Sequence, residues 1–427
     1  MGVQWQFWIL DFGFTEIPFR EGIGDLFVNV SYGTMTAMPI YIDVSAAVHA
    51  KAGIGRYAAS LAQALIELQP GRFALFYNRG RDTAPPAGLE AMPARTVRAG
   101  YKPWRMAVWL GQLAHVGFDR LVPGAELFHA TEHLLPPLHS AATVLTVHDM
   151  IFTLFPQTQK RLNFWYLNAT MPLYCRRADA IITVSECSKR DIVAHYHLDP
   201  AKVTVIHEAA GPEFRPASPA DQERVRQRYG LPEQFLIHVG VIEPRKNLTR
   251  LVEALQRLRD EGLSIPLVVV GPKGWLYGEF FQQLEQLQVR DAVCFPGYVP
   301  LADLAAVYSA ARLAAMPSVY EGFGLPVLEA MACGTPVVCS RVSSLPEIGG
   351  GAARYFDPLS VEEIAATIRT VWTDHDLRAA MRHQGLAQAS LFSWPRAAHQ
   401  TLDVYERTLA GRANPRSRIP VPPASGG

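Results

Sequence analysis

Cysteine is scarce in this sequence: the 427 residues contain five, scattered and without a CxxC spacing. That excludes a disulfide framework and a structural zinc site, and favours reduced thiols in a cytoplasmic protein. Charge of one sign is also lacking, since the formal net charge is +1, so no strong field attracts nucleic acid. No apolar run reaches the roughly 20 residues that span a bilayer. The first residues lack a basic n-region and are interrupted by Asp11, which argues against a signal peptide.

Short apolar strands alternate with amphipathic helices along most of the chain, which predicts βαβ units and parallel sheets. Prolines cluster at 211–220 and break this pattern. A chain of this length is also long for a single core. We therefore expect an α/β protein with two doubly wound, Rossmann-like domains, at residues 38–212 and 213–395, facing each other across a central cleft.

The ends of the chain follow a different pattern. Residues 396–411 place apolar side chains on one helical face and predict a last helix. Residues 412–427 are rich in Pro, Gly and Ser, so we expect a disordered tail. Residues 1–37 precede the first convincing strand and are expected to lie outside the fold.

The most informative segment is YEGFGLPVLEAMACGTPVVC, at residues 320–339. It predicts a loop of small residues that runs into a helix, whose free N–H groups and dipole favour an anion. A carboxylate one or two turns into that helix, here Glu329, can accept hydrogen bonds from ribose hydroxyls. A diphosphate attached to a ribose is half of a sugar nucleotide, and this is the ligand that the segment predicts.

Other candidate segments also follow predicted strands. They are Gly53-Ile54-Gly55-Arg56-Tyr57, His148-Asp149, the stretch from Gly240 to Asn247, and Glu321. Ligands bind beyond the carboxyl ends of strands in open parallel sheets, so this clustering predicts a single site between the domains. Arg245 and Lys246 lie beside a helix start, where they would stabilise the negative charge that develops on a leaving diphosphate.

The sequence resembles a known family. Glu321 and Glu329, separated by seven intervening residues, and the Gly-Thr-Pro turn at 334–336 resemble the donor-site signature of retaining glycosyltransferases of family 4, which have the GT-B fold. The resemblance covers roughly residues 39–410. It implies a retaining, metal-independent hexosyltransferase that uses a nucleotide-diphospho-sugar, with a saccharide or lipid-linked saccharide as acceptor, in cell-surface polysaccharide or lipopolysaccharide synthesis. The GIGRY and PRKN segments favour GDP-mannose as donor, with a UDP-sugar as the alternative. No cofactor is required.

The same resemblance implies roles for individual residues. Glu329 should hold the ribose hydroxyls, Glu321 should lie near the sugar ring, and His148 should approach the donor hexose. The domain at 38–212 should take the acceptor and that at 213–395 the donor, with the last helix crossing back to the first. The catalytic residues are then His148, Glu321, Arg245 and Lys246. The donor-binding residues are Gly53, Gly55, Gly240, Arg245, Lys246, Phe323, Gly324, Leu325 and Glu329.

Two further segments each allow two interpretations. Asp374-His375-Asp376 spells a metal-binding DxD, but Asp is common at helix starts, and we expect a cap and no metal. The stretch Tyr101–Phe118 is rich in tryptophan with basic residues at one end. It can lie in a membrane interface or form a buried helix near the acceptor, so peripheral contact with the inner face of the cytoplasmic membrane stays open.

Three alternative functions also stay open. Glu321 and Glu329 could be the paired carboxylates of a glycoside hydrolase. A nucleotide-sugar epimerase of the same fold would need further acid and base groups. A non-catalytic, nucleotide-sugar-binding scaffold would be expected to have lost part of the donor site.

Overall fold

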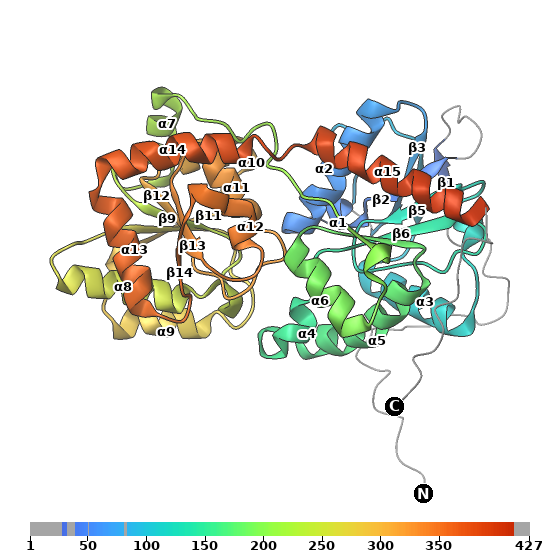
Figure 1. The fold of residues 1–427 in the computed structure, drawn as a ribbon, viewed down its shortest axis with the longest axis horizontal. Coiled ribbons are helices and arrows are strands. Elements are labelled where there is room, and N and C mark those ends of the chain that lie inside the picture. Colours follow the sequence, from blue (N-terminus) through green and yellow to red (C-terminus); the bar gives the residue numbers. More distant parts are fainter. Residues whose placement is uncertain (1–27, 32–38, 50, 81–82, 414–427) are drawn as a thin grey trace, which may run out of the picture.

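The computed structural model describes four stretches of the chain: residues 28–31, 39–49, 51–80 and 83–413 (Figure 1). The expected tail therefore lies almost wholly outside the described residues, and so does most of the expected N-terminal extension. Val28–Ser31 corrects the second expectation, since it forms strand β1, which pairs antiparallel with β4 (Ala94–Val97) at the edge of a sheet.

The N-terminal sheet has the order β1-β4-β3-β2-β5-β6-β7-β8, and every pair except β1 with β4 is parallel. Its remaining strands are β2 (Ile40–Asp43), β3 (Phe73–Asn78), β5 (Leu127–Ala130), β6 (Ala142–Val147), β7 (Ala180–Thr183) and β8 (Val203–Val205). All residues of β2, β3, β5 and β6 are buried. Helices cover both faces of such a sheet, which is why these strands read as continuous apolar runs.

The C-terminal sheet is parallel throughout, in the order β11-β10-β9-β12-β13-β14. Its strands are β9 (Leu236–Val239), β10 (Leu267–Val270), β11 (Val293–Gly297), β12 (Leu313–Met316), β13 (Val337–Ser340) and β14 (Arg354–Phe356). The chain thus forms two parallel-sheet domains (Figure 1), as the alternation of strands and helices predicts.

Helices flank both sheets. In the N-terminal domain they are α1 (Ser45–Val48), α2 (Ala52–Leu68), α3 (Tyr101–Ala114), α4 (Ile151–Leu154), α5 (Arg161–Arg177) and α6 (Glu186–Tyr196). In the C-terminal domain they are α7 (Pro219–Tyr229), α8 (Leu248–Asp260), α9 (Gly278–Gln286), α10 (Leu301–Ala310), α11 (Leu325–Ala332), α12 (Leu345–Gly349), α13 (Val361–Thr373) and α14 (His375–Ala389). Short 3-10 helices are η2 (Asp119–Leu121), η3 (Pro156–Thr158), η4 (Pro200–Lys202), η5 (Pro244–Lys246), η6 (Arg290–Ala292) and η7 (Gly350–Ala352).

The ends of helix α7 show how local sequence sets these bounds. The Ser218 side chain accepts a hydrogen bond from the Asp221 N–H, and Pro219 occupies the first helical position. Gly230 ends the helix with a φ of 62°, a conformation that favours glycine.

The last helix, α15 (Trp394–Ala413), lies on the N-terminal domain although it follows α14 in the chain (Figure 1). It packs on α2 and touches β6. The buried Tyr405 hydroxyl lies 2.6 Å from Nδ1 of His129 on β5. Helix α15 therefore connects the C-terminal domain back to the N-terminal domain.

The strand order reverses at one place in each sheet. In the N-terminal sheet β2 lies between β3 and β5, and in the C-terminal sheet β9 lies between β10 and β12. Open parallel sheets bind ligands beyond the carboxyl ends of the strands at such points. The predicted segments after β6, β9 and β12 all lie on this side of their sheets.

Candidate active site

Glu321 lies at the centre of the candidate site, five residues beyond β12. The Arg245 guanidinium donates to its Oε2 (2.6 Å), and Lys246 Nζ donates to its Oε1 (2.6 Å). The Ser318 hydroxyl also donates to Oε1, at 2.6 Å. The predicted residues after β9 and β12 therefore meet in one cluster, which the adjacency of the two strands brings about.

The two cations are fully compensated in this arrangement. Arg245 also donates through Nε and Nη2 to Glu243 Oε1, at 3.0 and 2.6 Å, so two carboxylates face two cations. Burial alone would raise the pKa of Glu321, but Arg245 and Lys246 lower it to about 2. Burial in turn lowers the pKa of Lys246 from its usual value, and Arg245 adds to that effect. Glu321 is therefore ionised at neutral pH, and it holds both cations in place.

The carboxylate of Glu329, which is expected to bind a ribose, is bound by other side chains of the protein. It lies on α11, 1% exposed, and pairs with the Arg56 guanidinium of α2. The Tyr308 hydroxyl of α10 donates to its Oε2 at 3.0 Å. Burial raises the pKa of Glu329, while Arg56 and Tyr308 act in the opposite direction. The pair with Arg56 joins the two domains.

The loop between Glu321 and α11 touches the N-terminal domain directly. The Ser185 hydroxyl, at the start of α6, donates to the Gly322 carbonyl at 2.6 Å. A Cβ on Gly322 would lie 2.6 Å from the His148 carbonyl oxygen and 2.9 Å from Asp149 Cβ. Only a glycine allows this approach. The two predicted segments, after β6 and after β12, are therefore in contact.

The rest of this loop supports α11. Gly324 precedes the helix with a φ of 113°, which favours glycine. Phe323 is buried, and its carbonyl accepts a hydrogen bond from the Ser344 hydroxyl at 2.6 Å. Leu325 is half-buried at the first helical position. Their predicted contacts with hexose and phosphates stay predictions.

His148 is buried directly after β6, and both of its ring nitrogens have partners. Nε2 lies 2.9 Å from the Thr131 carbonyl oxygen, and Nδ1 lies 3.3 Å from Glu208 Oε1. The Tyr57 ring meets the imidazole edge-on, with centroids 4.7 Å apart. Burial opposes the charged imidazole, but Glu208, Thr131 and Asp149 together outweigh that effect and raise the pKa of His148.

The three predicted glycines outside this loop differ in their surroundings. A Cβ on Gly55 would lie 2.9 Å from the Ala46 carbonyl oxygen, so this glycine lets α2 pack against α1. A Cβ on Gly53 would meet nothing within 4 Å in the described part of the chain. The Gly240 carbonyl oxygen would lie 2.1 Å from a Cβ on Gly271, so the chain itself packs closely around Gly240.

Several residues of this site carry no sequence signal that we recognised. Glu208 follows β8 in an ordinary loop, and Tyr308 lies on a helix of apolar residues. Glu347 on α12 pairs with His207 at 2.6 Å and accepts the Glu186 N–H at 3.0 Å. Each partner lies far away in the sequence, which is why spacing alone could not find them.

The Asp374-His375-Asp376 segment lies outside this site. The Asp374 side chain caps α14 by accepting the Leu377 N–H at 2.9 Å, which confirms the expected cap. Within the described residues, no three His, Cys, Asp or Glu side chains gather where they could hold a metal ion. Nor is any helix of the described residues long and apolar enough to cross a membrane.

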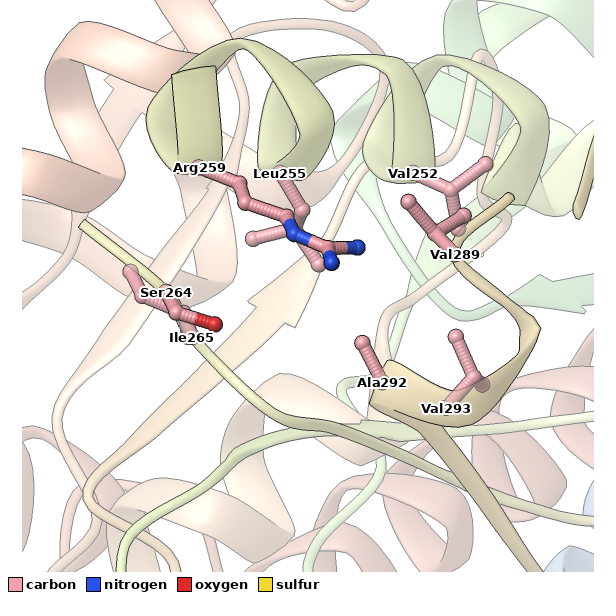
Figure 2. A pocket seen from close by; sticks show the side chains of 8 residues that line it. All are labelled: Val252, Leu255, Arg259, Ser264, Ile265, Val289, Ala292 and Val293. Atoms are coloured by element: carbon pink, nitrogen blue, oxygen red, sulfur yellow. The ribbon is translucent and has the colours of Figure 1, made fainter. Parts of the chain in front are cut away.

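A pocket on the C-terminal domain lies apart from the site (Figure 2). It contains none of the predicted site residues. Its lining is mostly aliphatic, from Val252, Leu255, Arg259, Ser264, Ile265, Val289, Ala292 and Val293.

Two family descriptions match the chain. Residues 52–213 match Glycosyltransferase Family 4, and residues 221–388 match Glycosyl transferases group 1. O-antigen chain mannosyltransferase B of Escherichia coli is 36% identical over 282 residues, which are 66% of this chain and 74% of that protein. The chain therefore belongs to glycosyltransferase family 4, as the resemblance implied, and it is a glycosyltransferase.

Other relatives align over less of their own length. The serotype-specific mannosyltransferase WbdA of Escherichia coli is 30% identical over 281 residues, or 62% of this chain and 34% of WbdA. The MMP alpha-(1->4)-mannosyltransferase of Mycolicibacterium hassiacum is 32% identical over 241 residues, or 55% of this chain and 56% of that protein. The chain thus spans about a third of WbdA and about half of the mycobacterial enzyme.

Solved structures share the fold. Sucrose-phosphate synthase from Thermosynechococcus elongatus superposes with a TM-score of 0.69 at 21% identity, over 88% of this chain and 100% of that one. Anabaena Alr3699/HepE, solved in complex with UDP and glucose, gives 0.65 at 20% identity, over 86% of this chain and 99% of that one. These likenesses confirm the predicted two-domain GT-B fold.

Proposed function

We propose that this glycosyltransferase moves mannose from GDP-mannose to a hydroxyl of a saccharide or lipid-linked saccharide, in the synthesis of cell-surface polysaccharide or lipopolysaccharide. The observation that carries the proposal is the buried cluster of Glu321, Arg245 and Lys246, at the strand-order reversal of the C-terminal sheet. The names of the related mannosyltransferases support the sugar, and that of mannosyltransferase B supports the pathway. A UDP-sugar is the alternative donor.

The two domains divide the substrates in this proposal. Residues 213–395 bind the donor, and residues 38–212 bind the acceptor. Arg245 and Lys246 bind the diphosphate and exchange part of their contacts with Glu243 and Glu321 for phosphate oxygens. Glu321 keeps both cations in position and lies near the transferred sugar. Once the donor is bound, both cations are in place before the glycosidic bond breaks, so they stabilise the developing charge without further rearrangement.

The transfer proceeds with retention, by displacement on the face of the sugar that the diphosphate leaves. A leaving phosphate oxygen helps to remove the proton of the acceptor hydroxyl. Two cations and the N-terminus of α11 supply the positive charge for the leaving group, so no metal is required. Contact between the domains at Gly322 and Ser185 excludes water and protects the donor from hydrolysis.

Donor binding also changes the partners of Glu329 in this account. The ribose hydroxyls replace Arg56 at the carboxylate, as the resemblance implies for this position. Arg56 is free to move, because its side chain is 36% exposed. It then turns to the diphosphate as a third cation. The interdomain pair is thus exchanged for contacts that run through the substrate.

The alternative functions are weaker. A glycoside hydrolase needs a carboxylic acid with a raised pKa as proton donor. Glu321, with its pKa lowered to about 2, cannot serve as that proton donor, and a hydrolase of this kind needs both carboxyl groups. An epimerase needs separate acid and base groups, and a scaffold does not need a buried, compensated cation cluster.

We also propose that α3 and α5 contact the surface of an anionic membrane. The helices pack together, since Arg105 donates to the Asn163 side chain at 3.2 Å. They expose large apolar side chains at Leu110, Leu113, Leu162 and Trp165. Exposed Lys102 and Arg161 lie beside them, which suits a negatively charged interface. Co-sedimentation with phosphatidylglycerol vesicles tests this, and equal binding by a Leu113→Glu/Trp165→Glu variant would refute it.

The transfer itself is tested by incubating the protein with GDP-mannose, methyl α-mannoside and EDTA, and reading the product by proton NMR. The proposal predicts an α-linked product. A β-linked product would contradict retention, and a requirement for added Mg²⁺ would contradict metal independence. Turnover of UDP-glucose but not of GDP-mannose would move the donor to the alternative.

A further inference from the structure

The strand-order reversal of the N-terminal sheet carries a second buried polar cluster. Asp43 is the last residue of β2, and Glu132 lies two residues beyond the neighbouring strand β5. This position in the N-terminal sheet corresponds to that of the cluster of Glu321, Arg245 and Lys246 in the C-terminal sheet. Ligands of open parallel sheets bind at such points, and none of the roles assigned above uses these two residues.

Only one carboxylate oxygen of Glu132, Oε2, has partners among the described residues. Lys51, at the start of α2, forms an ion pair with its Oε2, and the Tyr101 hydroxyl of α3 donates to the same oxygen at 3.2 Å. The Lys51 ammonium lies 3.5 Å from the centroid of the Tyr101 ring. The Lys51 side chain is 25% exposed and that of Glu132 4%, so the carboxylate lies behind a partly exposed lysine.

Two carboxyl oxygens of this cluster lack a hydrogen-bond donor. Glu132 Oε1 and Asp43 Oδ2 are buried and have no partner among the residues that the structure describes. Their residues are only 3% and 1% exposed. Buried polar atoms are satisfied in the great majority of cases, and an unsatisfied one calls for a missing partner. The missing groups here are donors, because both oxygens can accept.

The cluster is adjacent to His148. The Thr131 hydroxyl donates to the Asp43 carbonyl at 2.5 Å, and the Thr131 carbonyl faces His148 Nε2 at 2.9 Å. Glu132 is the next residue in the chain. A ligand on Glu132 and Asp43 would therefore lie beside the histidine that is expected to approach the donor hexose.

We propose that Glu132 and Asp43 bind hydroxyl groups of the acceptor saccharide and position it for attack on the donor sugar. The proposal rests on the proposed function and names its acceptor subsite. Neutral sugar hydroxyls can donate to both free oxygens, whereas a phosphate or carboxylate would be repelled by them. Burial and the neighbouring Glu132 raise the pKa of Asp43 to about 7, so near neutrality a fraction of Asp43 can also donate to a sugar oxygen.

Steady-state kinetics with Glu132→Gln test the proposal, with GDP-mannose as donor and with methyl α-mannoside and an α-linked mannobiose as acceptor probes. Losing hydrogen bonds to a charged acceptor predicts a rise of about 10- to 100-fold in the KM for the acceptor. The KM for GDP-mannose and its slow hydrolysis without acceptor should stay within about twofold. Lys51→Gln removes the ion pair that holds Glu132 and should therefore also raise the acceptor KM. Because Lys51 is partly exposed, this variant should fold, and it tests the subsite even where Glu132→Gln does not fold.

Asp303→Asn is the matched control. Asp303 is also buried and ion-paired, with Arg224 and Arg228, but lies on α10 outside both clusters. It should leave both KM values unchanged. An unchanged acceptor KM in both test variants, or equal changes for donor and acceptor, would overturn the subsite. Hydrolysis of GDP-mannose without saturable transfer to either sugar would overturn the assignment to saccharide. Failure of the wild type to turn over any nucleotide sugar would instead overturn the proposed function.

Discussion

Arg56 and Glu329 form an ion pair between the two domains, from helix α2 to helix α11. The carboxylate that should receive the ribose is thus held by a cation from the opposite domain, with Tyr308 as a second donor. We interpret this pair as the contact that the donor replaces. It links donor binding to the relation between the domains.

Replacing Arg56 tests this exchange. In Arg56→Met the donor should bind about 10-fold more weakly, because one cation near the diphosphate is lost. Isothermal titration with GDP-mannose measures the change. Arg257→Met removes an exposed pair with Glu362 and should have no effect. Tighter binding by Arg56→Met would show that the pair only competes with the donor.

The cluster around Glu321 should dominate the stability of the C-terminal domain. Glu321→Gln leaves Arg245 and Lys246 buried with too little negative charge, which should cost about 3–5 kcal/mol of unfolding free energy. Urea denaturation measures this loss. Glu362→Gln, which removes an exposed partner of Arg257, should cost less than about 1 kcal/mol.

The pH dependence of this loss has a definite sign. The pKa of Glu321 is lowered to about 2 in the folded protein, from a usual value of 4.5. A lowered pKa stabilises the fold above the unfolded value and loses that effect as pH falls through the folded one. The stability difference between wild type and Glu321→Gln should therefore be constant above about pH 5 and shrink toward pH 2. A difference that grows on acidification would contradict the assigned charges.

Gly322 should be intolerant of any side chain, because it touches the other domain. A Cβ there would lie 2.6 Å from the His148 carbonyl oxygen, a backbone atom that cannot turn away. Gly322→Ala should lower kcat at least about 10-fold by separating the domains. Gly278→Ala, where a Cβ meets nothing within 4 Å among the described residues, is the matched control. Equal activities in the two variants would refute the role of this contact.

Glu208 should control the protonation of His148. Removing its charge in Glu208→Gln eliminates the largest contribution that raises the pKa of His148, so the imidazole should titrate at lower pH. NMR of the histidine ring follows this titration. The pH–rate profile should shift in the same direction if His148 acts at the donor hexose. A shifted titration with an unchanged profile would make His148 structural.

The strands with continuous apolar runs could be predicted from the sequence, because such runs are typical of parallel strands that are buried on both faces. β4 and β14 carry no such run, because each is short and contains an arginine, which is half-buried at Arg95 in β4 and exposed at Arg354 in β14. Arg245, Lys246 and Glu321 could be predicted to meet, because each follows a strand of one parallel sheet.

The ion-pair and hydrogen-bond partners of the site residues could not be predicted. Arg56 and Glu329 lie 273 residues apart, and His148 and Glu208 lie 60 apart. No periodicity links positions that lie so far apart in the sequence. Glu132 and Lys51 carry no motif at all, so only the fold brings them together with Asp43.

The most direct test of the central claim is donor binding, by thermal shift with GDP-, UDP-, ADP- and dTDP-sugars in EDTA. A ligand that binds only the folded state stabilises it by about 2.7 kcal/mol at 100 times its dissociation constant. We predict a selective shift with GDP-mannose in the wild type, which is lost in Lys246→Met. A well-folded wild type that no nucleotide sugar stabilises, or a Lys246→Met variant that responds like the wild type, would contradict the account.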